Sequence, residues 1–110
     1  MNQFKQGQVT GAGAAINVSL GWVPDYVKVF NITDGTLAYE WVNGMPAANA
    51  LRTQNVVDNG TTTNGSFNAI TANGITSFAG SGSAAPGFTI GSAIAVSAKT
   101  LSWVAFRDIP

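Results

Sequence analysis

Carboxylates are the main candidates for acid–base chemistry in this chain, because it contains neither histidine nor cysteine. Without those residues, a Ser-His or Cys-His catalytic pair, a disulfide and a zinc–thiolate site are all excluded. A glycosidase would need two carboxylates held roughly 5–10 Å apart. The acidic residues available for such a pair are Asp25, Asp34, Glu40, Asp58 and Asp108.

None of these carboxylates belongs to a recognised catalytic or metal-binding pattern. Asp34 is taken by a turn, Asp25 sits beside Pro24 at a corner, and Asp58 precedes a glycine turn. No stretch resembles an EF-hand or a repeated aspartate loop. We therefore expect no catalytic residue, no metal site and no cofactor, and a protein that is not an enzyme.

Charge is scarce throughout the chain. Of its 110 residues 9% are charged and the net charge is zero, whereas an ordinary soluble domain has roughly 25% charged residues. So little charge is a poor surface for a free monomer, which indicates that much of the surface is covered in an assembly.

The basic residues form no cluster, so we expect no binding to nucleic acid. No apolar run reaches the roughly 18 residues of a membrane span, and the N-terminus lacks a signal-peptide layout, which predicts a protein made inside a cell and kept there or released by lysis.

The stretch from Trp22 to Asn43 reads as a β-hairpin turning at Asp34-Gly35. Asp-Gly between two alternating β-branched and aromatic runs is the strongest short-range hairpin signal. With these two residues as the loop, Phe30 pairs with Tyr39 and Lys28 with Trp41. Lys28 would then make a cation–π contact with the indole or lay its aliphatic stem over it.

This register gives the hairpin two apolar faces, and such a hairpin needs cover on both sides. The aromatic face or the valine face forms the core, and the other meets a partner. The first face carries Phe30, Ile32, Leu37, Tyr39 and Trp41, and the second carries Val27, Val29, Ala38 and Val42 with Glu40 among them.

The rest of the chain predicts further strands. Residues 1–13 read as an extended N-terminal arm, either frayed or docked on a neighbouring subunit. Ala14–Leu20 and Thr100–Arg107 read as strands. Residues 59–98 carry no charge and are either a low-complexity linker or several short strands with tight turns at Asn64-Gly65, Asn73-Gly74 and Pro86-Gly87; the regular Phe and Ile spacing favours strands.

The fold class that follows is all-β. We expect a single domain over residues 14–110, an antiparallel β-sandwich or small barrel of jelly-roll type, preceded by the arm at residues 1–13.

Several runs together resemble small virion proteins of tailed bacteriophages, of the head decoration or cement type. These runs are GWVPDYVKVFNITDG, YEWVNGM, ITANGITSFAG, GFTIGS and LSWVAFR, spread over roughly residues 20–107. The uncharged segment Ser92–Ser97 departs from those proteins, many of which carry charge there. The resemblance implies a homotrimer on the outer capsid surface of a virion, made in the host cytoplasm, which bridges subunits of the major capsid protein.

The leading hypothesis is therefore a non-enzymatic structural protein that stabilises a phage capsid by binding the assembled shell. The alternative is a tail-fibre or receptor-binding module in which exposed Trp22 or Trp41 stacks on a bacterial surface glycan. The predicted interface residues are Phe4, Lys5, Val27, Val29, Phe30, Tyr39, Trp41 and Val42.

Overall fold

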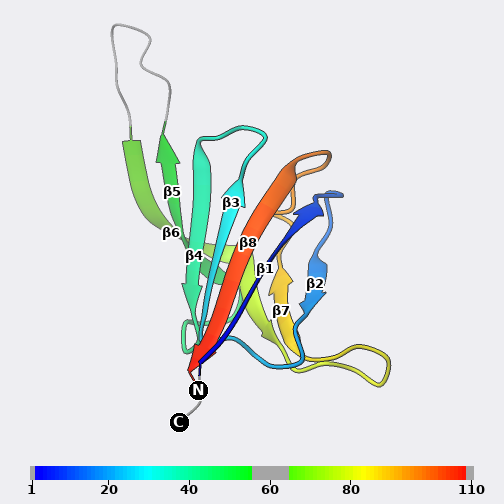
Figure 1. Ribbon diagram of the computed structural model, residues 1–110. Coiled ribbons are helices and arrows are strands. Elements are labelled where there is room, and N and C mark those ends of the chain that lie inside the picture. Colours follow the sequence, from blue (N-terminus) through cyan, green and yellow to red (C-terminus); the bar gives the residue numbers. More distant parts are fainter. Residues whose placement is uncertain (1, 56–64, 109–110) are drawn as a thin grey trace, which may run out of the picture.

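Eight antiparallel strands form a single sheet in the computed structural model, which describes residues 2–55 and 65–108 (Figure 1). Among these residues there is no helix. The order across the sheet is β1-β8-β3-β4-β5-β6-β7-β2. The strands are β1 (Asn2–Thr10), β2 (Ile16–Ser19), β3 (Tyr26–Asn31), β4 (Leu37–Val42), β5 (Asn49–Asn55), β6 (Gly65–Phe78), β7 (Gly87–Ile90) and β8 (Thr100–Asp108).

The sheet curls into a half-barrel because β6 serves two partners. The first half of β6 pairs with β5 and the second half with β7, and the register shifts where Asn49 pairs with Ile75 but Ala50 pairs with Ile70. At this corner Asn73 has a positive φ of 57°, so the turn predicted at Asn73-Gly74 is a bend within a long strand. We call β1, β8, β3, β4, β5 and the first half of β6 the front layer; the second half of β6, β7 and β2 lie behind it (Figure 1).

The all-β antiparallel prediction is confirmed, but its finer form is not. One continuous curled sheet replaces the two separate sheets of a sandwich, and no jelly-roll topology is present in the described ranges. The strand reading of the uncharged segment is confirmed for β6 and β7. Of the turn predicted at Asn64-Gly65, only Gly65 lies within the described residues. Asp58 lies outside them.

The hairpin exists, but its predicted register is wrong by one residue. Val27 lies opposite Trp41, Phe30 opposite Ala38 and Lys28 opposite Glu40, and the loop runs from Ile32 to Thr36. Since side chains alternate between faces, a shift of one residue exchanges the faces of one strand relative to the other. The valines of β3 and the aromatic side chains of β4 therefore share one face.

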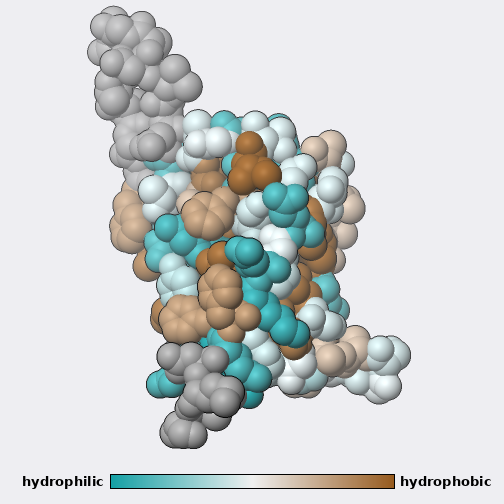
Figure 2. Space-filling view, in the orientation of Figure 1, coloured by the Kyte–Doolittle hydropathy of each residue, from teal (hydrophilic) through white to brown (hydrophobic). Residues whose placement is uncertain are grey.

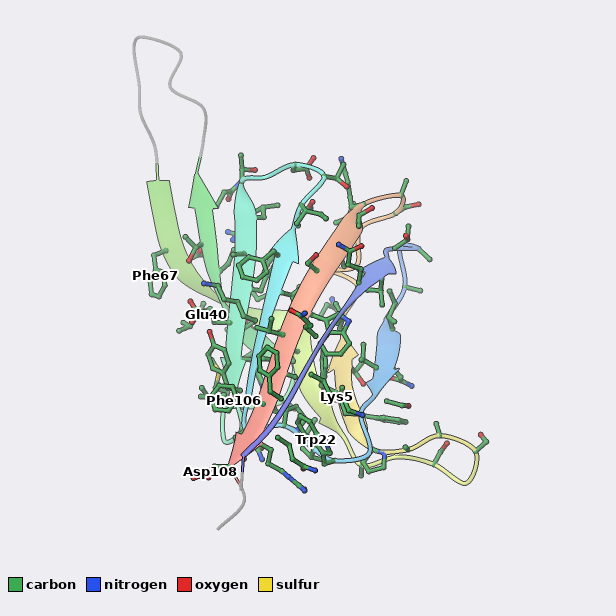
Figure 3. All side chains as sticks on the ribbon, in the orientation of Figure 1. Lys5, Trp22, Glu40, Phe67, Phe106 and Asp108 are labelled. Carbon is green, nitrogen blue, oxygen red and sulfur yellow. The ribbon has the colours of Figure 1, made fainter. Side chains whose placement is uncertain are left out.

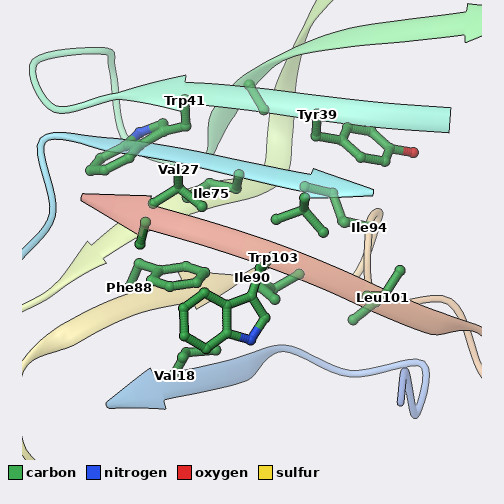
Figure 4. Close-up of a cluster of buried hydrophobic side chains, with 14 of the residues drawn as sticks. Val18, Val27, Tyr39, Trp41, Ile75, Phe88, Ile90, Ile94, Leu101 and Trp103 are labelled. Atoms are coloured by element: carbon green, nitrogen blue, oxygen red, sulfur yellow. The ribbon is translucent and has the colours of Figure 1, made fainter. Parts of the chain in front are cut away.

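That shared face lines the core. The buried side chains from the front layer meet those from β7, β2 and the β7–β8 connection inside the half-barrel (Figure 4). Phe88 meets Trp103 edge-on with ring centroids 5.4 Å apart. This core includes Val27, Val29, Tyr39, Trp41, Ile75, Phe88, Ile90, Ile94, Leu101 and Trp103.

The predicted N-terminal arm is replaced by a strand. Asn2 to Thr10 pairs along the whole of β8, from Asp108 to Thr100. A Cβ on Gly7 would lie 2.8 Å from the indole of Trp103, so this strand packs through its backbone. Beyond it, Gly11 N–H donates to the Lys99 carbonyl at 2.8 Å, which ties the following segment to the domain as well.

Candidate interaction surface

The side of the front layer that points away from the core forms a broad, mixed surface, which we call the outer face. It faces the viewer in Figures 2 and 3, where brown and tan apolar groups lie among teal polar ones. The strand registers assign its residues: Phe4, Gln6 and Gln8 on β1; Ser102, Val104 and Phe106 on β8; Tyr26, Lys28 and Phe30 on β3; Ala38, Glu40 and Val42 on β4; Leu51 and Thr53 on β5; and Phe67 and Ala69 on β6.

An apolar row crosses four strands of the outer face. Phe4 pairs with Phe106, Phe106 with Tyr26, and Tyr26 with Val42. The rings of Tyr26 and Phe106 lie 5.3 Å apart between centroids. Phe4 is 61% exposed, Val42 49% and Phe106 40%. We call these four residues the aromatic row; such a contiguous exposed apolar group is typical of a contact site.

Beside the aromatic row lies a charged pair that does not form an internal ion pair. Lys28 and Glu40 are opposite each other on β3 and β4. The Tyr26 hydroxyl donates to Glu40 Oε2 at 2.8 Å, and the Lys28 ammonium lies 5.1 Å from the centre of the Phe30 ring. The predicted contact of Lys28 with Trp41 is therefore wrong, because the corrected register points Trp41 into the core.

The environment of Tyr26 favours its neutral form. Partial burial is the largest of three causes that raise the pKa of Tyr26 to about 12. The hydrogen bond to the Glu40 carboxylate is the second cause, and the negative charge of that carboxylate is the third. The neutral hydroxyl keeps donating to Glu40 at physiological pH. The carboxylate is thus held at a fixed place beside the aromatic row (Figure 3).

Two hollows flank Phe30 on the outer face. One, of about 290 Å³, is lined by Phe30 together with Leu37, Ala38 and Thr53 and by the β3–β4 loop. The other, of about 430 Å³, lies toward β1 and β8 and is lined by Gln6, Gln8, Ser102 and Val104 among others. Phe30 thus forms a ridge between two depressions, an arrangement suited to interlocking with another surface.

The predicted interface residues divide between surface and core. Phe4 and Val42 are exposed and Phe30 is half-buried, all three on the outer face. Lys5 instead donates from Nζ to the Leu20 carbonyl at 2.7 Å, across the opening between β1 and β2. The remaining four predicted residues lie in the core of the chain itself and are not available to a partner: Val27, Val29, Tyr39 and Trp41.

The carboxylates of Asp25, Asp34 and Glu40 have local structural partners. Asp34 binds Lys99 Nζ at 2.8 Å, and that hydrogen bond is the largest influence lowering the pKa of Asp34. Asp25 Oδ2 accepts the Asp108 N–H at 3.0 Å, which pins the end of β8. Within residues 2–55 and 65–108, no three acidic side chains gather in a way that could hold a metal ion, and no helix is long and apolar enough to cross a membrane.

Three aromatic side chains of the outer face escaped the interface prediction: Tyr26, Phe67 and Phe106. The signal for Phe106 was present, because the last strand is apolar on both faces and one of them had to point outward. Phe67, the most exposed large apolar side chain at 66%, stood in the uncharged segment with no pattern to place it.

Comparisons of the chain with protein-family models, with curated proteins and with solved structures find no match.

Proposed function

We propose that this protein is a non-enzymatic structural protein that decorates a bacteriophage capsid and stabilises it by bridging capsid subunits. The observation that carries the proposal is the aromatic row, an exposed apolar stripe on a chain with 9% charged residues. A surface of this kind is suited to lasting contact with another protein rather than to free solution. The resemblance to phage decoration proteins supplies the kind of partner, the major capsid protein, and the place, the outer surface of the virion.

Stabilisation of a shell by such a protein follows from binding linkage. A protein that binds the assembled lattice and not its separated subunits shifts the equilibrium toward the lattice. Repetition of the same contact over many equivalent sites multiplies the effect. Weak individual contacts, of the size that the aromatic row offers, are then sufficient.

The glycan-binding alternative loses the side chains on which it depended. Trp22 and Trp41 are 6% and 2% exposed, so neither ring has a face open to a sugar. Stacking on a glycan needs an accessible aromatic face. Neither Trp22 nor Trp41 can therefore serve as a stacking platform for a glycan.

Attachment to bare shells tests the proposal. Purified protein is mixed with phage capsids assembled without it, the particles are sedimented, and their resistance to heat is compared with and without bound protein. We expect saturable binding at a copy number comparable to that of the major capsid protein, and shells that rupture at a higher temperature. Absence of binding to shells, or binding to tails alone, would refute the proposal.

A further inference from the structure

The outer face has a symmetry that the aromatic row alone does not reveal. Its central residues form ladder rows across β3 and β4: Lys28 with Glu40, Phe30 with Ala38, and Tyr26 with Val42. In each row the side chain on β3 is matched by a complementary one on β4. A cation faces an anion in one row, and a large ring faces a small aliphatic group in the other two.

Such rows are self-complementary under a two-fold rotation. Consider an axis that lies between two facing sheets, runs along the strands and passes midway between β3 and β4. It places Lys28 of one copy over Glu40 of the other, and Glu40 of the first over Lys28 of the second. This reciprocity, in which residue i meets j and j meets i, defines an isologous interface.

The neighbouring strands extend the match. Val104 on β8 and Leu51 on β5 belong to the row of Lys28 and Glu40, so the rotation brings these two aliphatic side chains together. Phe30 is carried over Ala38, which lines the hollow of about 290 Å³ beside the β3–β4 loop. Each copy thus offers a ridge and a receiving hollow at related positions.

The two opposite charges on the outer face, Lys28 and Glu40, are not paired with each other. Lys28 and Glu40 are direct neighbours, yet the lysine lies over Phe30 while the glutamate accepts the Tyr26 hydroxyl. In the described part of the chain the one ion pair is that of Lys99 with Asp34. Opposite charges brought together from two copies would gain both the pairing and the orientation that charge complementarity gives.

The dimensions fit a stable pair. The strands β1, β8, β3, β4 and β5 have six to nine residues, so at ~3.3 Å per residue they are roughly 20–30 Å long, and six strands spaced ~4.8 Å apart give the outer face an area on the order of 700 Å². Each partner in a standard protein interface buries about 800 Å². Packed sheets whose strands run nearly parallel are also an ordinary arrangement.

We propose that the outer face binds a second copy of this chain, giving a two-fold dimer in which Lys28 of each copy meets Glu40 of the other. The inference rests on the proposed function in taking the outer face as a contact surface, but it replaces the implied trimer with a pair. Phe4 on β1 lies opposite the place where the partner's β6 bends toward the back layer, whereas Phe106 on β8 lies over the start of the partner's β5. Phe4 therefore stays uncovered in the pair and remains available to the shell.

Charge reversal in separate chains tests this pairing. The variants Lys28→Glu and Glu40→Lys each place like charges together in a homodimer, so each should weaken self-association by about tenfold or more in sedimentation equilibrium. An equimolar mixture of the two restores both opposite pairs and should recover the dimer. Only a contact between chains can produce this recovery. Ser77→Glu, an exposed position on the rear half of β6, is the matched control and should dimerise as the unaltered chain does.

A second measurement needs no variant. Unlabelled protein mixed with ¹⁵N-labelled protein is treated with a zero-length carbodiimide, and we expect Lys28–Glu40 crosslinked peptides that carry one labelled and one unlabelled half. A monomer at all concentrations, a trimer, single variants that dimerise normally, or crosslinks confined to one isotope would each overturn the inference. If the protein forms the dimer but does not bind shells, only the decoration function is refuted. If it is a monomer that binds shells, only the dimer is refuted.

Discussion

Lys28 and Glu40 are opposite one another on β3 and β4, yet their side chains turn toward different rings of the same face. The lysine lies over Phe30, and the glutamate holds the Tyr26 hydroxyl at 2.8 Å. The two charges thereby flank an apolar surface without neutralising each other.

Tyr26 should resist ionisation until strongly alkaline pH. Its pKa in the folded protein is raised from 10.0 to about 12, so the folded state holds a proton that the unfolded state releases between these values. The stabilising contribution is complete below pH 10.0 and is lost as the pH rises toward about 12. Tyrosinate absorbance measured during an alkaline titration, with Tyr26→Phe to assign the signal, checks this. Glu40→Gln should move the ionisation to lower pH; an unchanged titration would contradict the role of Glu40.

The buried amide of Asn31 should be essential to the β3–β4 loop. Its Oδ1 accepts the Asp34 N–H at 3.1 Å and its Nδ2 donates to Asp34 Oδ2 at 3.0 Å, while the residue is 2% exposed. Asn31→Ala removes both bonds and should lower the free energy of unfolding by about 1–3 kcal/mol. Urea denaturation measures it, with exposed Asn43→Ala as the control that should change little. Equal midpoints for the two variants would contradict this account of the loop.

Acid should weaken the link between Asp34 and Lys99. The hydrogen bond from Lys99 lowers the pKa of Asp34 below its ordinary 3.8. The stabilisation is therefore present above pH 3.8 and is lost as the pH falls through the lowered value. The difference in unfolding free energy between the unaltered chain and Asp34→Asn, measured by urea denaturation, should shrink from about pH 6 to about pH 2. A difference that stays constant over this range would show that the ion pair contributes nothing.

The corner of β6 should not accept a side chain at Gly74. A Cβ there would lie 2.6 Å from the Ala48 carbonyl oxygen, and the Gly74 N–H donates to that same oxygen at 2.8 Å. Gly74→Ala should cost on the order of 2 kcal/mol of stability or prevent folding. Thermal unfolding tests it, with Gly82→Ala as the control, because a Cβ at Gly82 meets nothing within 4 Å. Equal melting temperatures would contradict the close approach.

How far the sequence determined the fold depends on whether side chains or backbone carried each feature. The class, the hairpin and the last strand could be predicted because their apolar alternation is strong. The register could not, because the Asp-Gly signal suggested a two-residue turn whereas the Asn31 side chain closes a longer loop. β1 escaped for a related reason: Gly7 stands where its inner face meets Trp103, so the strand has little apolar pattern.

The site was found only in part for the same physical reason. Phe4, Phe30 and Val42 lie on the outer face as surface residues, but the shifted register sent Tyr39 and Trp41 inward with the valines. Composition indicated that a covered surface exists. It could not indicate which face of a hairpin, apolar on both sides, would be turned outward.

Attachment of altered protein to undecorated shells tests the central claim most directly. In the double variant Phe4→Ser with Phe106→Ser, the exposed end of the aromatic row is removed; the chain should remain folded by circular dichroism, and its binding to sedimented shells should fall sharply. Val96→Ser, a 41% exposed apolar side chain on the β7–β8 connection, should bind as the unaltered protein does. Full binding by the folded double variant would contradict the assignment of the aromatic row as the surface that meets the shell.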